Sequence, residues 1–305
     1  MTYAIGVDLG GTKTAAARVW PDGTIGDVVT APTPARVGPA AVFDQVAELV
    51  RQLDPTDAVG IGVGAAGVVD SRVGRIIYAT ETFADWVGAD IPGQLRSRLD
   101  LPPSRPLEVR NDVDAHALGE AWLGAARGRD SMLLVAVGTG VGGSVVLNGR
   151  LWTGARSVAG EIGHFPTPGA ETDRCACGRF GHLEGIAAGP AIERYYRYTT
   201  GESTGGREIM ARAEAGEEAA LSVVRRAATA LGKAITGLVS FIDPACVVIG
   251  GGIAQAGAVW WDPLLQSCHD DLIEIQRDIP IVPAELGPTA AIAGAARAVF
   301  DAVGL

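Results

Sequence analysis

A β-strand, a glycine-rich turn and a second β-strand occur twice in this chain, and this repeat constrains the fold more than any other feature. The first copy occupies residues 3–19, with Gly10 and Gly11 at its turn. The second occupies residues 132–147, with a glycine turn at residues 138–143. Helical periodicities and apolar runs follow each copy. The sequence therefore predicts an α/β protein of two similar domains around a cleft in which nucleotide and substrate meet.

The remaining pattern places further elements and divides the chain. It predicts strands at residues 25–30, 58–63, 107–110, 150–153 and 245–249, and helices at residues 39–53, 115–125, 187–196, 217–241 and 289–303. We expect a small N-terminal α/β domain over residues 1–112 and a large α/β domain over residues 113–288. The last helix, at about residues 289–305, is expected to pack back on the first domain.

Composition excludes several classes of protein. A formal net charge of −10 and a pI near 4.9 argue against a nucleic-acid-binding surface. With 48% hydrophobic and 20% charged residues, the chain is globular and not disordered. No apolar run reaches membrane-spanning length, a strand begins at the second residue, and four cysteines suit a reducing compartment. We therefore predict a cytoplasmic protein.

One loop has the composition of a zinc site. Two cysteines and two histidines stand within nineteen residues: His164, Cys175, Cys177 and His182. Thiolates and imidazole nitrogens suit a tetrahedral zinc ion, and four protein ligands leave no position for a catalytic water, so the metal is expected to be structural. The acids Glu161 and Glu184 stand just outside this set, where a metal would fix them rigidly enough to grip a polyhydroxylated ligand. The alternative is a loop whose thiols and imidazoles are incidental.

The first glycine turn has the composition of a phosphate-binding loop: Asp8, Gly10, Gly11, Thr12 and Lys13. It puts a carboxylate at a strand end and lets backbone N–H groups approach an anion. A strand follows it, whereas a Rossmann fingerprint requires a helix, and no Walker A pattern occurs. Taken alone, the motif is more typical of a plain hairpin turn.

The second turn makes a phosphate site the better interpretation. It contains Gly138, Thr139, Gly140 and Gly142. Paired, the two turns predict a two-sided phosphate clamp. A third run, Gly250, Gly251 and Gly252, would let backbone lie flat against a nucleotide base or ribose. Asp8 would then hold Mg²⁺ through water, because Mg²⁺ keeps much of its hydration shell.

The order of these motifs resembles that of ROK-family sugar kinases (repressor, open reading frame, kinase). It runs Asp-x-Gly-Gly-Thr-Lys, Asn-Asp, Gly-Thr-Gly-x-Gly-Gly, Glu-x-Gly-His, Cys-x-Cys-Gly-x-x-Gly-x-x-Glu and Gly-Gly-Gly over essentially the whole chain. The resemblance implies the duplicated actin-like, ribonuclease-H-like ATPase fold. It also implies ATP- and Mg²⁺-dependent phosphorylation of a hexose hydroxyl. Glucose is the leading substrate, and an N-acylhexosamine such as N-acetylmannosamine is the alternative.

The resemblance also assigns roles on the sugar side. Asp112 is expected to be the base that takes the hydroxyl proton, whereas its residue type alone is more typical of a helix N-cap. Asn111 would orient the same sugar. Glu161, His164 and Glu184 would hold ring hydroxyls, with one nitrogen of His164 on zinc and the other on sugar.

The resemblance also implies a role for Gly67. Gly67 would offer backbone to the sugar, although a glycine-rich strand exit is the plainer interpretation.

Three positions depart from the family pattern. His182 stands where a third cysteine is usual, Thr82 stands where many members have a sugar-binding Asn, and Ala66 replaces a proline. Zinc accepts either ligand set, so metal binding should survive, while substrate identity stays open.

Two other functions remain as hypotheses. ROK repressors carry an additional DNA-binding helix-turn-helix domain, whereas this chain is acidic and begins directly at the first strand, so we expect no nucleic-acid partner. A non-catalytic sugar-binding protein would not need Asp8, Asn111 and Asp112 together. We expect a homodimer or higher homo-oligomer. His116 and His269 have no partner visible in the sequence and receive no role.

Overall fold

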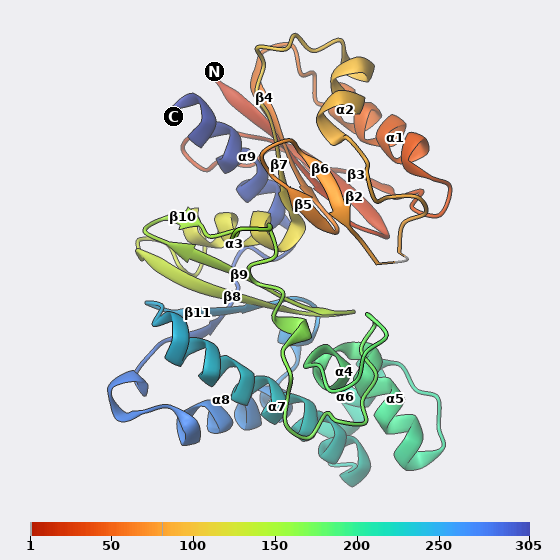
Figure 1. Cartoon of the computed structure of the whole chain (residues 1–305), viewed down its shortest axis with the longest axis vertical. Coiled ribbons are helices and arrows are strands. Elements are labelled where there is room, and N and C mark those ends of the chain that lie inside the picture. Colours follow the sequence, from red (N-terminus) through yellow and green to blue (C-terminus); the bar gives the residue numbers. More distant parts are fainter. Residues whose placement is uncertain (1, 81) are drawn as a thin grey trace. The chain divides into compact units, whose positions relative to one another are not determined.

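The structure is a computed structural model and describes residues 2–80 and 82–305. The chain divides into two compact units, coloured by sequence in Figure 1. The first unit combines Met1–Asp130, Ser144–Ala159 and Glu285–Leu305; the second combines Ser131–Gly143 and Gly160–Ala284. This division differs from the predicted one after residue 112, because the helix that follows Asn111 packs within the first unit.

The first unit is built on a five-stranded sheet in the order β3-β2-β1-β4-β7. Its strands are β1 (Tyr3–Leu9), β2 (Lys13–Val19), β3 (Val29–Pro32), β4 (Ala58–Ala65) and β7 (Leu107–Asn111). The first three form the predicted antiparallel meander, and β4 and β7 continue the sheet in parallel with β1. The third strand begins later than predicted. Before it, the chain pairs with β2 through an isolated bridge between Val19 and Ile25, and regular pairing with β2 starts at Val29.

Both faces of this sheet are covered, as the alternation of side chains along β1 requires. Ile5, Val7 and Leu9 enter one core together with Phe43 of helix α1 (Pro39–Gln52). Ala4 enters a second core with residues of α9 (Ala290–Val303). Here the helix backbone lies directly on the sheet, because a Cβ at Gly6 or Gly62 would overlap the α9 carbonyls.

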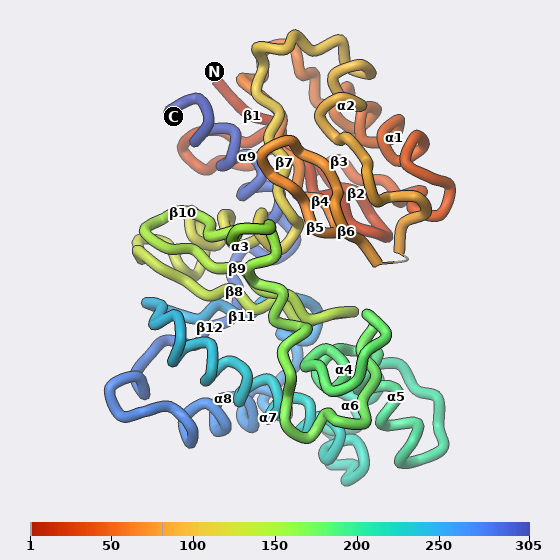
Figure 2. The backbone as a smooth tube through the Cα atoms, in the orientation of Figure 1, coloured from red at the N-terminus to blue at the C-terminus, as the bar shows by residue number. Residues whose placement is uncertain are grey.

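The first unit also contains two helices and a small second sheet. Helix α2 (Ile91–Leu99) packs on α1, and its first turn is capped by the Asp90 carboxylate, which accepts from the Gly93 N–H. Helix α3 (Asp112–Trp122) packs along α9. The strands β5 (Val68–Asp70) and β6 (Arg75–Tyr78), which the sequence pattern did not reveal, form a separate two-stranded sheet (Figure 2).

A second five-stranded sheet has the order β10-β9-β8-β11-β12. Its strands are β8 (Ser131–Val137), β9 (Val141–Leu147), β10 (Arg150–Leu151), β11 (Val247–Gly250) and β12 (Ile281–Pro283). In both sheets the opening strand lies between the strand after its glycine turn and a parallel strand from later in the chain. The predicted repeat is therefore present in the topology.

The second unit is otherwise helical. It contains α4 (Glu184–Ala187), α5 (Gly189–Thr200), α6 (Gly206–Glu214), α7 (Glu218–Ile242) and α8 (Ala258–Asp271), with 3-10 turns at Ile162–His164, Ile253–Gln255 and Glu274–Gln276. The helix predicted at residues 187–196 corresponds to α5, and α4 is a separate short helix before it. Ala188 is extended and Pro190 cannot continue the preceding helix, so the chain breaks there. Among the described residues, no helix is long and apolar enough to cross a membrane.

Candidate active site and metal centre

The carboxylate predicted to be the base stands at the junction of β7 and α3. The side-chain oxygen of Asn111 accepts hydrogen bonds from the N–H groups of Val113 (2.8 Å) and Asp114 (3.2 Å) and so caps α3. The helix N-cap is therefore Asn111, and the N-cap interpretation of Asp112 is wrong. Asp112 is the first residue of the helix, and one of its oxygens accepts from the Asn111 amide at 2.9 Å.

The environment of Asp112 suits proton transfer. Burial raises the pKa of its carboxyl to about 6, and the negative charge of Asp8 adds to the increase. A carboxylate with a pKa this close to neutrality is ionised at pH 7 and still accepts a proton readily. Asn111 is thus hydrogen-bonded to Asp112, and Asp8 is close enough to Asp112 to raise its pKa.

Asp8 stands near the end of β1, beside the N-terminus of α3. In the sheet it is the register partner of Gly64 on β4. A Cβ on Gly64 would lie 2.8 Å from the Cβ of Ala115 and 3.7 Å from the Cα of Asp112, so α3 packs directly over this point. Burial raises the pKa of Asp8, while the nearby side chains of His116 and Lys13 lower it. A half-buried carboxylate of this kind can supply the hard oxygen ligand that Mg²⁺ prefers.

The turn after Asp8 is held in place by hydrogen bonds. The Gly10 N–H donates to the Lys13 carbonyl at 3.2 Å, so it is committed to the turn. The Thr33 hydroxyl donates to the Gly10 carbonyl at 2.8 Å, and the Thr33 N–H donates to the Thr12 carbonyl at 2.9 Å. Thr12 and Lys13 are exposed. A side chain at Gly11 would overlap Thr82, so the turn and the loop that carries Thr82 lie against each other.

Gly67 occupies a conformation that favours glycine, with φ of 101° and a would-be Cβ 2.9 Å from the Tyr78 carbonyl. Its own carbonyl accepts a hydrogen bond from the Asn111 amide at 3.0 Å. That carbonyl therefore fixes Asn111 and is partly used before any sugar arrives.

The glycine turns of the second unit lie together at the ends of β8 and β11. In the turn after β8, the Gly138 N–H donates to the Gly140 carbonyl at 2.9 Å, and the Gly138 carbonyl accepts from the Gly189 N–H at 2.8 Å. A Cβ on Gly138 would lie 3.9 Å from the Gly252 nitrogen. Gly251 has φ of 90°, and a side chain there would overlap the Val137 backbone. Of the remaining predicted positions, Thr139 lies in the same turn, Gly142 is the second residue of β9 and Gly250 is the last residue of β11.

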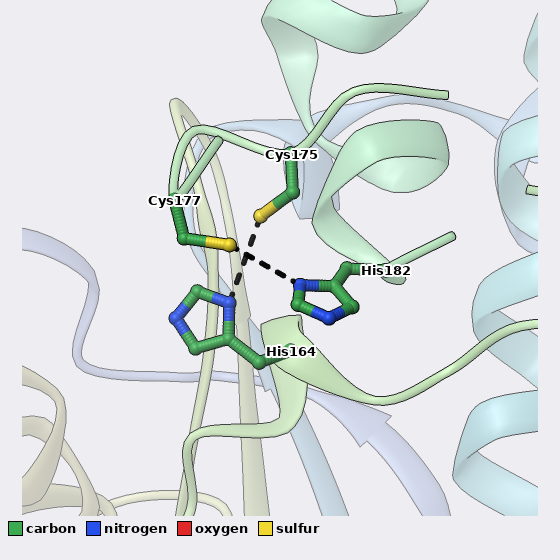
Figure 3. Close-up of side chains that lie close together, drawn as sticks. All are labelled: His164, Cys175, Cys177 and His182. Atoms are coloured by element: carbon green, nitrogen blue, oxygen red, sulfur yellow. Dashed lines mark hydrogen bonds between the residues drawn. The ribbon is translucent and has the colours of Figure 1, made fainter. Parts of the chain in front are cut away.

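The four predicted metal ligands are gathered in one place (Figure 3). Their ligand atoms all lie within 4.8 Å of one another: those of His164, Cys175, Cys177 and His182. The sulfur of Cys175 is 3.6 Å from Nδ1 of His164, and that of Cys177 is 3.3 Å from Nδ1 of His182. Tetrahedral zinc with ordinary Zn–S and Zn–N bonds would separate such atoms by about 3.6 Å. The donor set and its spacing therefore fit zinc.

Two acidic residues, Glu161 and Glu184, contact members of this cluster. Nε2 of His164 faces away from the sulfurs and lies 3.7 Å from a carboxylate oxygen of Glu161. Burial raises the pKa of Glu161, His164 lowers it, and Glu184 raises it. The three side chains are therefore close enough to influence one another electrostatically. Glu184 accepts from the Cys175 thiol at 3.3 Å and from the Val141 N–H at 3.2 Å. Its carboxylate thus joins the metal cluster to the second glycine turn.

Two residues near Asp112 escaped the sequence reasoning. Glu120 is fully buried on α3, and Nε2 of His116 lies 3.8 Å from one of its carboxylate oxygens. The available signal was spacing, because Asp112, His116 and Glu120 recur every four residues and so share one helix face.

Comparison with known proteins agrees with this arrangement. The sequence matches the ROK family over residues 4–302. A glucokinase of Thermotoga maritima is 32% identical over 316 aligned residues, which cover 98% of each chain. The bifunctional enzyme NanE/NanK of Brucella melitensis is 36% identical over 292 residues, covering 95% of this chain and 52% of that protein.

A solved structure extends the likeness to the fold. The ROK-family glucokinase of Streptomyces griseus, in complex with glucose and AMPPNP, superimposes with a TM-score of 0.81 at 30% identity and covers 97% of this chain and 98% of that one. The paired sheets are the actin-like ATPase fold of these sugar kinases. With the family match over nearly the whole length, this chain belongs to the ROK family.

Proposed function

We propose that this protein is an ATP-dependent sugar kinase that phosphorylates a hexose hydroxyl, with glucose as its leading substrate. The observation that carries the proposal is the carboxyl of Asp112, whose pKa is raised to about 6 by burial and by Asp8. Similarity to glucokinases, one of them with glucose and AMPPNP bound, supports the substrate and the donor.

In this proposal the residues of the first unit handle the proton and the phosphates. Asp112 accepts the proton of the attacking hydroxyl, and Asn111, fixed by Gly67, orients the sugar. Asp8 holds Mg²⁺ through water, beside the turn of Gly10 and Gly11. When bound, the ion neutralises charge on the phosphates as the γ-phosphoryl group transfers.

The residues of the second unit are proposed to bind the rest of the two substrates. Glu161, His164 and Glu184 hold ring hydroxyls. The turn of Gly138, Thr139, Gly140 and Gly142 and the run of Gly250, Gly251 and Gly252 accept the nucleotide. A structural zinc on His164, Cys175, Cys177 and His182 would fix the carboxylates, because Glu161 lies beside His164 and Glu184 beside Cys175.

An N-acylhexosamine such as N-acetylmannosamine is the second candidate substrate. The 36% identity to NanE/NanK is the observation that favours it. The residues described here do not distinguish the two, since the family's sugar-binding Asn is absent and Thr82 stands in its place.

The experiment measures ADP release with Mg-ATP against glucose, mannose, N-acetylglucosamine and N-acetylmannosamine. Turnover with one of these sugars is the expected result and names the substrate. Asp112→Asn should reduce kcat by orders of magnitude and leave sugar binding intact, while Asp278→Asn, an exposed acid of the second unit, should behave as wild type. A folded protein that binds sugar but turns over none would contradict the proposal, as would an unchanged kcat in the Asp112 variant.

A further inference from the structure

The second unit has a hollow of about 400 Å³ along one side of α7. Arg225, Thr229 and Lys233 line it and follow one another at four-residue steps, so they share one side of the helix. Pro168 and Gly169, from the loop between His164 and Cys175, line it as well. The proposed reaction uses none of the residues that line this hollow.

Two cations at the hollow have no partner of their own. Among residues 2–80 and 82–305, the side chains of Arg225 and Lys233 take part in no ion pair and in no hydrogen bond. Both side chains are exposed. The chain has 35 acidic and 25 basic side chains, so two uncompensated cations at one hollow give it a local potential opposite to the net charge of the protein.

Arg226 joins α7 to the loop that lines the same hollow. Its guanidinium donates to the Gly169 carbonyl at 2.9 Å and forms an ion pair with Asp173. The same guanidinium lies over the ring of Tyr195, 4.3 Å from its centroid. The lining on the two sides of the hollow is therefore held together before any ligand arrives, which lowers the cost of ordering the site on binding.

A neighbouring hollow of about 590 Å³ has the opposite character. It shares the same three residues of α7 and lies toward α8. Three acids of α8 also line it: Asp262, Asp270 and Asp271. Their charges would repel an anion, whereas the smaller hollow is lined by a single acid, Glu218. An anion attracted by Arg225 and Lys233 therefore belongs in the smaller hollow.

The chemistry of the smaller hollow suits a phosphate group. Arg225 and Lys233 are separated by about 12 Å along the helix axis, so their long side chains can reach one phosphate from two sides. Guanidinium and ammonium groups form charge-assisted hydrogen bonds with phosphate oxygens. Ser222 and Thr229 add hydroxyls, and Glu218 can accept from hydroxyls of a ligand. The volume falls within the range of about 300–1,000 Å³ that is usual for small-molecule sites, which leaves room for more than the phosphate itself.

We infer that this hollow binds a phosphate dianion, with Arg225 and Lys233 on the phosphate oxygens and Glu218 beside the rest of the ligand. Two sources share this chemistry: inorganic phosphate and a hexose phosphate of the kind that a sugar kinase releases. The second source rests on the proposed function. The site itself does not, because it contains no residue assigned to the reaction.

The test measures binding to this hollow with the proposed active site already filled. Titration calorimetry adds glucose 6-phosphate or inorganic phosphate to the full chain at constant ionic strength, in the presence of saturating glucose and Mg-AMPPNP. The double variant Arg225→Ala/Lys233→Ala removes both cations. Arg207→Ala, which removes an exposed arginine of α6, is the matched control.

Wild-type protein should bind at least one of the two ligands with one equivalent per chain. The double variant should raise the Kd by at least about tenfold, because charge-assisted hydrogen bonds contribute more than neutral ones. Its Tm should equal that of the wild type, since both substituted side chains are exposed. Arg207→Ala should bind as the wild type does. Tighter binding of glucose 6-phosphate than of inorganic phosphate identifies the hexose phosphate as the ligand, and equal binding identifies inorganic phosphate; both results support the site.

Other outcomes overturn the inference and are distinct from failure of the proposed function. Absence of binding by both ligands to the wild type overturns it, as does an unchanged Kd in the double variant. An equal loss in Arg207→Ala also overturns it, because general attraction of anions to surface charge would do the same. A wild type that phosphorylates no sugar, but whose phosphate binding is lost in the double variant alone, contradicts the proposed function and supports the site.

Discussion

The raised pKa of Asp112 predicts an acid limb in the activity of this enzyme. Burial and the charge of Asp8 raise this pKa from 3.8 to about 6. A base with that pKa is about nine-tenths ionised at pH 7 and about one-tenth ionised at pH 5, so the rate should fall about tenfold over this interval. An unshifted carboxyl would stay more than about nine-tenths ionised at pH 5 and would show almost no loss.

The assay follows ADP release from pH 5 to pH 8 with both substrates below KM, so that the rate reports the free enzyme. Excess Mg²⁺ keeps the nucleotide in one charge state. Asp8→Asn supplies a matched comparison, because loss of the negative charge should lower the pKa of Asp112 and move the limb to lower pH, whatever the variant's absolute rate. A limb near pH 4 in the wild type, or one that Asp8→Asn does not move, would refute the reasoning.

The titration of Asp112 does not destabilise the native state at low pH, so unfolding caused by this residue cannot produce the acid limb of the activity. The native pKa of Asp112 lies above the unfolded value of 3.8, so the native state binds this proton more tightly. The carboxyl contributes stability that is fully present below about pH 4 and is lost as the pH rises through about 6. Protonation of Asp112 therefore stabilises the native state. A Tm measured from pH 8 down to pH 5 should not fall because of this residue.

Three further predictions address the metal, the buried acid and the helix packing. Wild-type protein should contain one zinc per chain by elemental analysis, and Cys177→Ser should reduce that content and weaken sugar binding more than Mg-ADP binding; absence of zinc contradicts the site. Glu120→Gln should lower the free energy of unfolding in denaturant titrations by about 1–3 kcal/mol, because one backbone N–H would face an amide NH₂ instead of an oxygen. An unchanged free energy of unfolding would contradict the role of Glu120 as an acceptor for three backbone N–H groups. Gly62→Ala should cost about 3 kcal/mol, because a methyl group overlaps the Ala295 carbonyl, whereas Gly237→Ala, with open space around it, should be neutral or stabilising.

Sequence reasoning succeeded where the signal is local. The strand and glycine-turn repeat is confirmed in both sheets, because a glycine pair between two apolar runs determines a hairpin within a few residues. The metal-ligand cluster could be found for the same reason, since three of its members lie within eight residues. The helix predicted to begin at residue 115 instead begins at Asp112, because the cap is supplied by Asn111 rather than by a residue inside the apolar pattern.

The rest depended on contacts that no local pattern encodes. Glu120 accepts from Glu285 and Leu286, which are 165 and 166 residues away, so its role cannot be read from its neighbours in sequence. The division into units was missed for a related reason. The contact between α3 and α9 joins helices more than 160 residues apart and assigns α3 to the first unit.

The packing of α9 has a consequence for biosynthesis. Ile292, Ala296 and Phe300 complete the core that contains Ala4 and Val19, so the second face of these first strands stays uncovered until α9 has left the ribosome. A nascent chain at that stage exposes an apolar surface made of its earliest residues, which is the kind of surface that chaperones bind and that aggregates. Independent cotranslational folding of the N-terminal segment is therefore disfavoured, and the first unit becomes stable only after α9 has been synthesised.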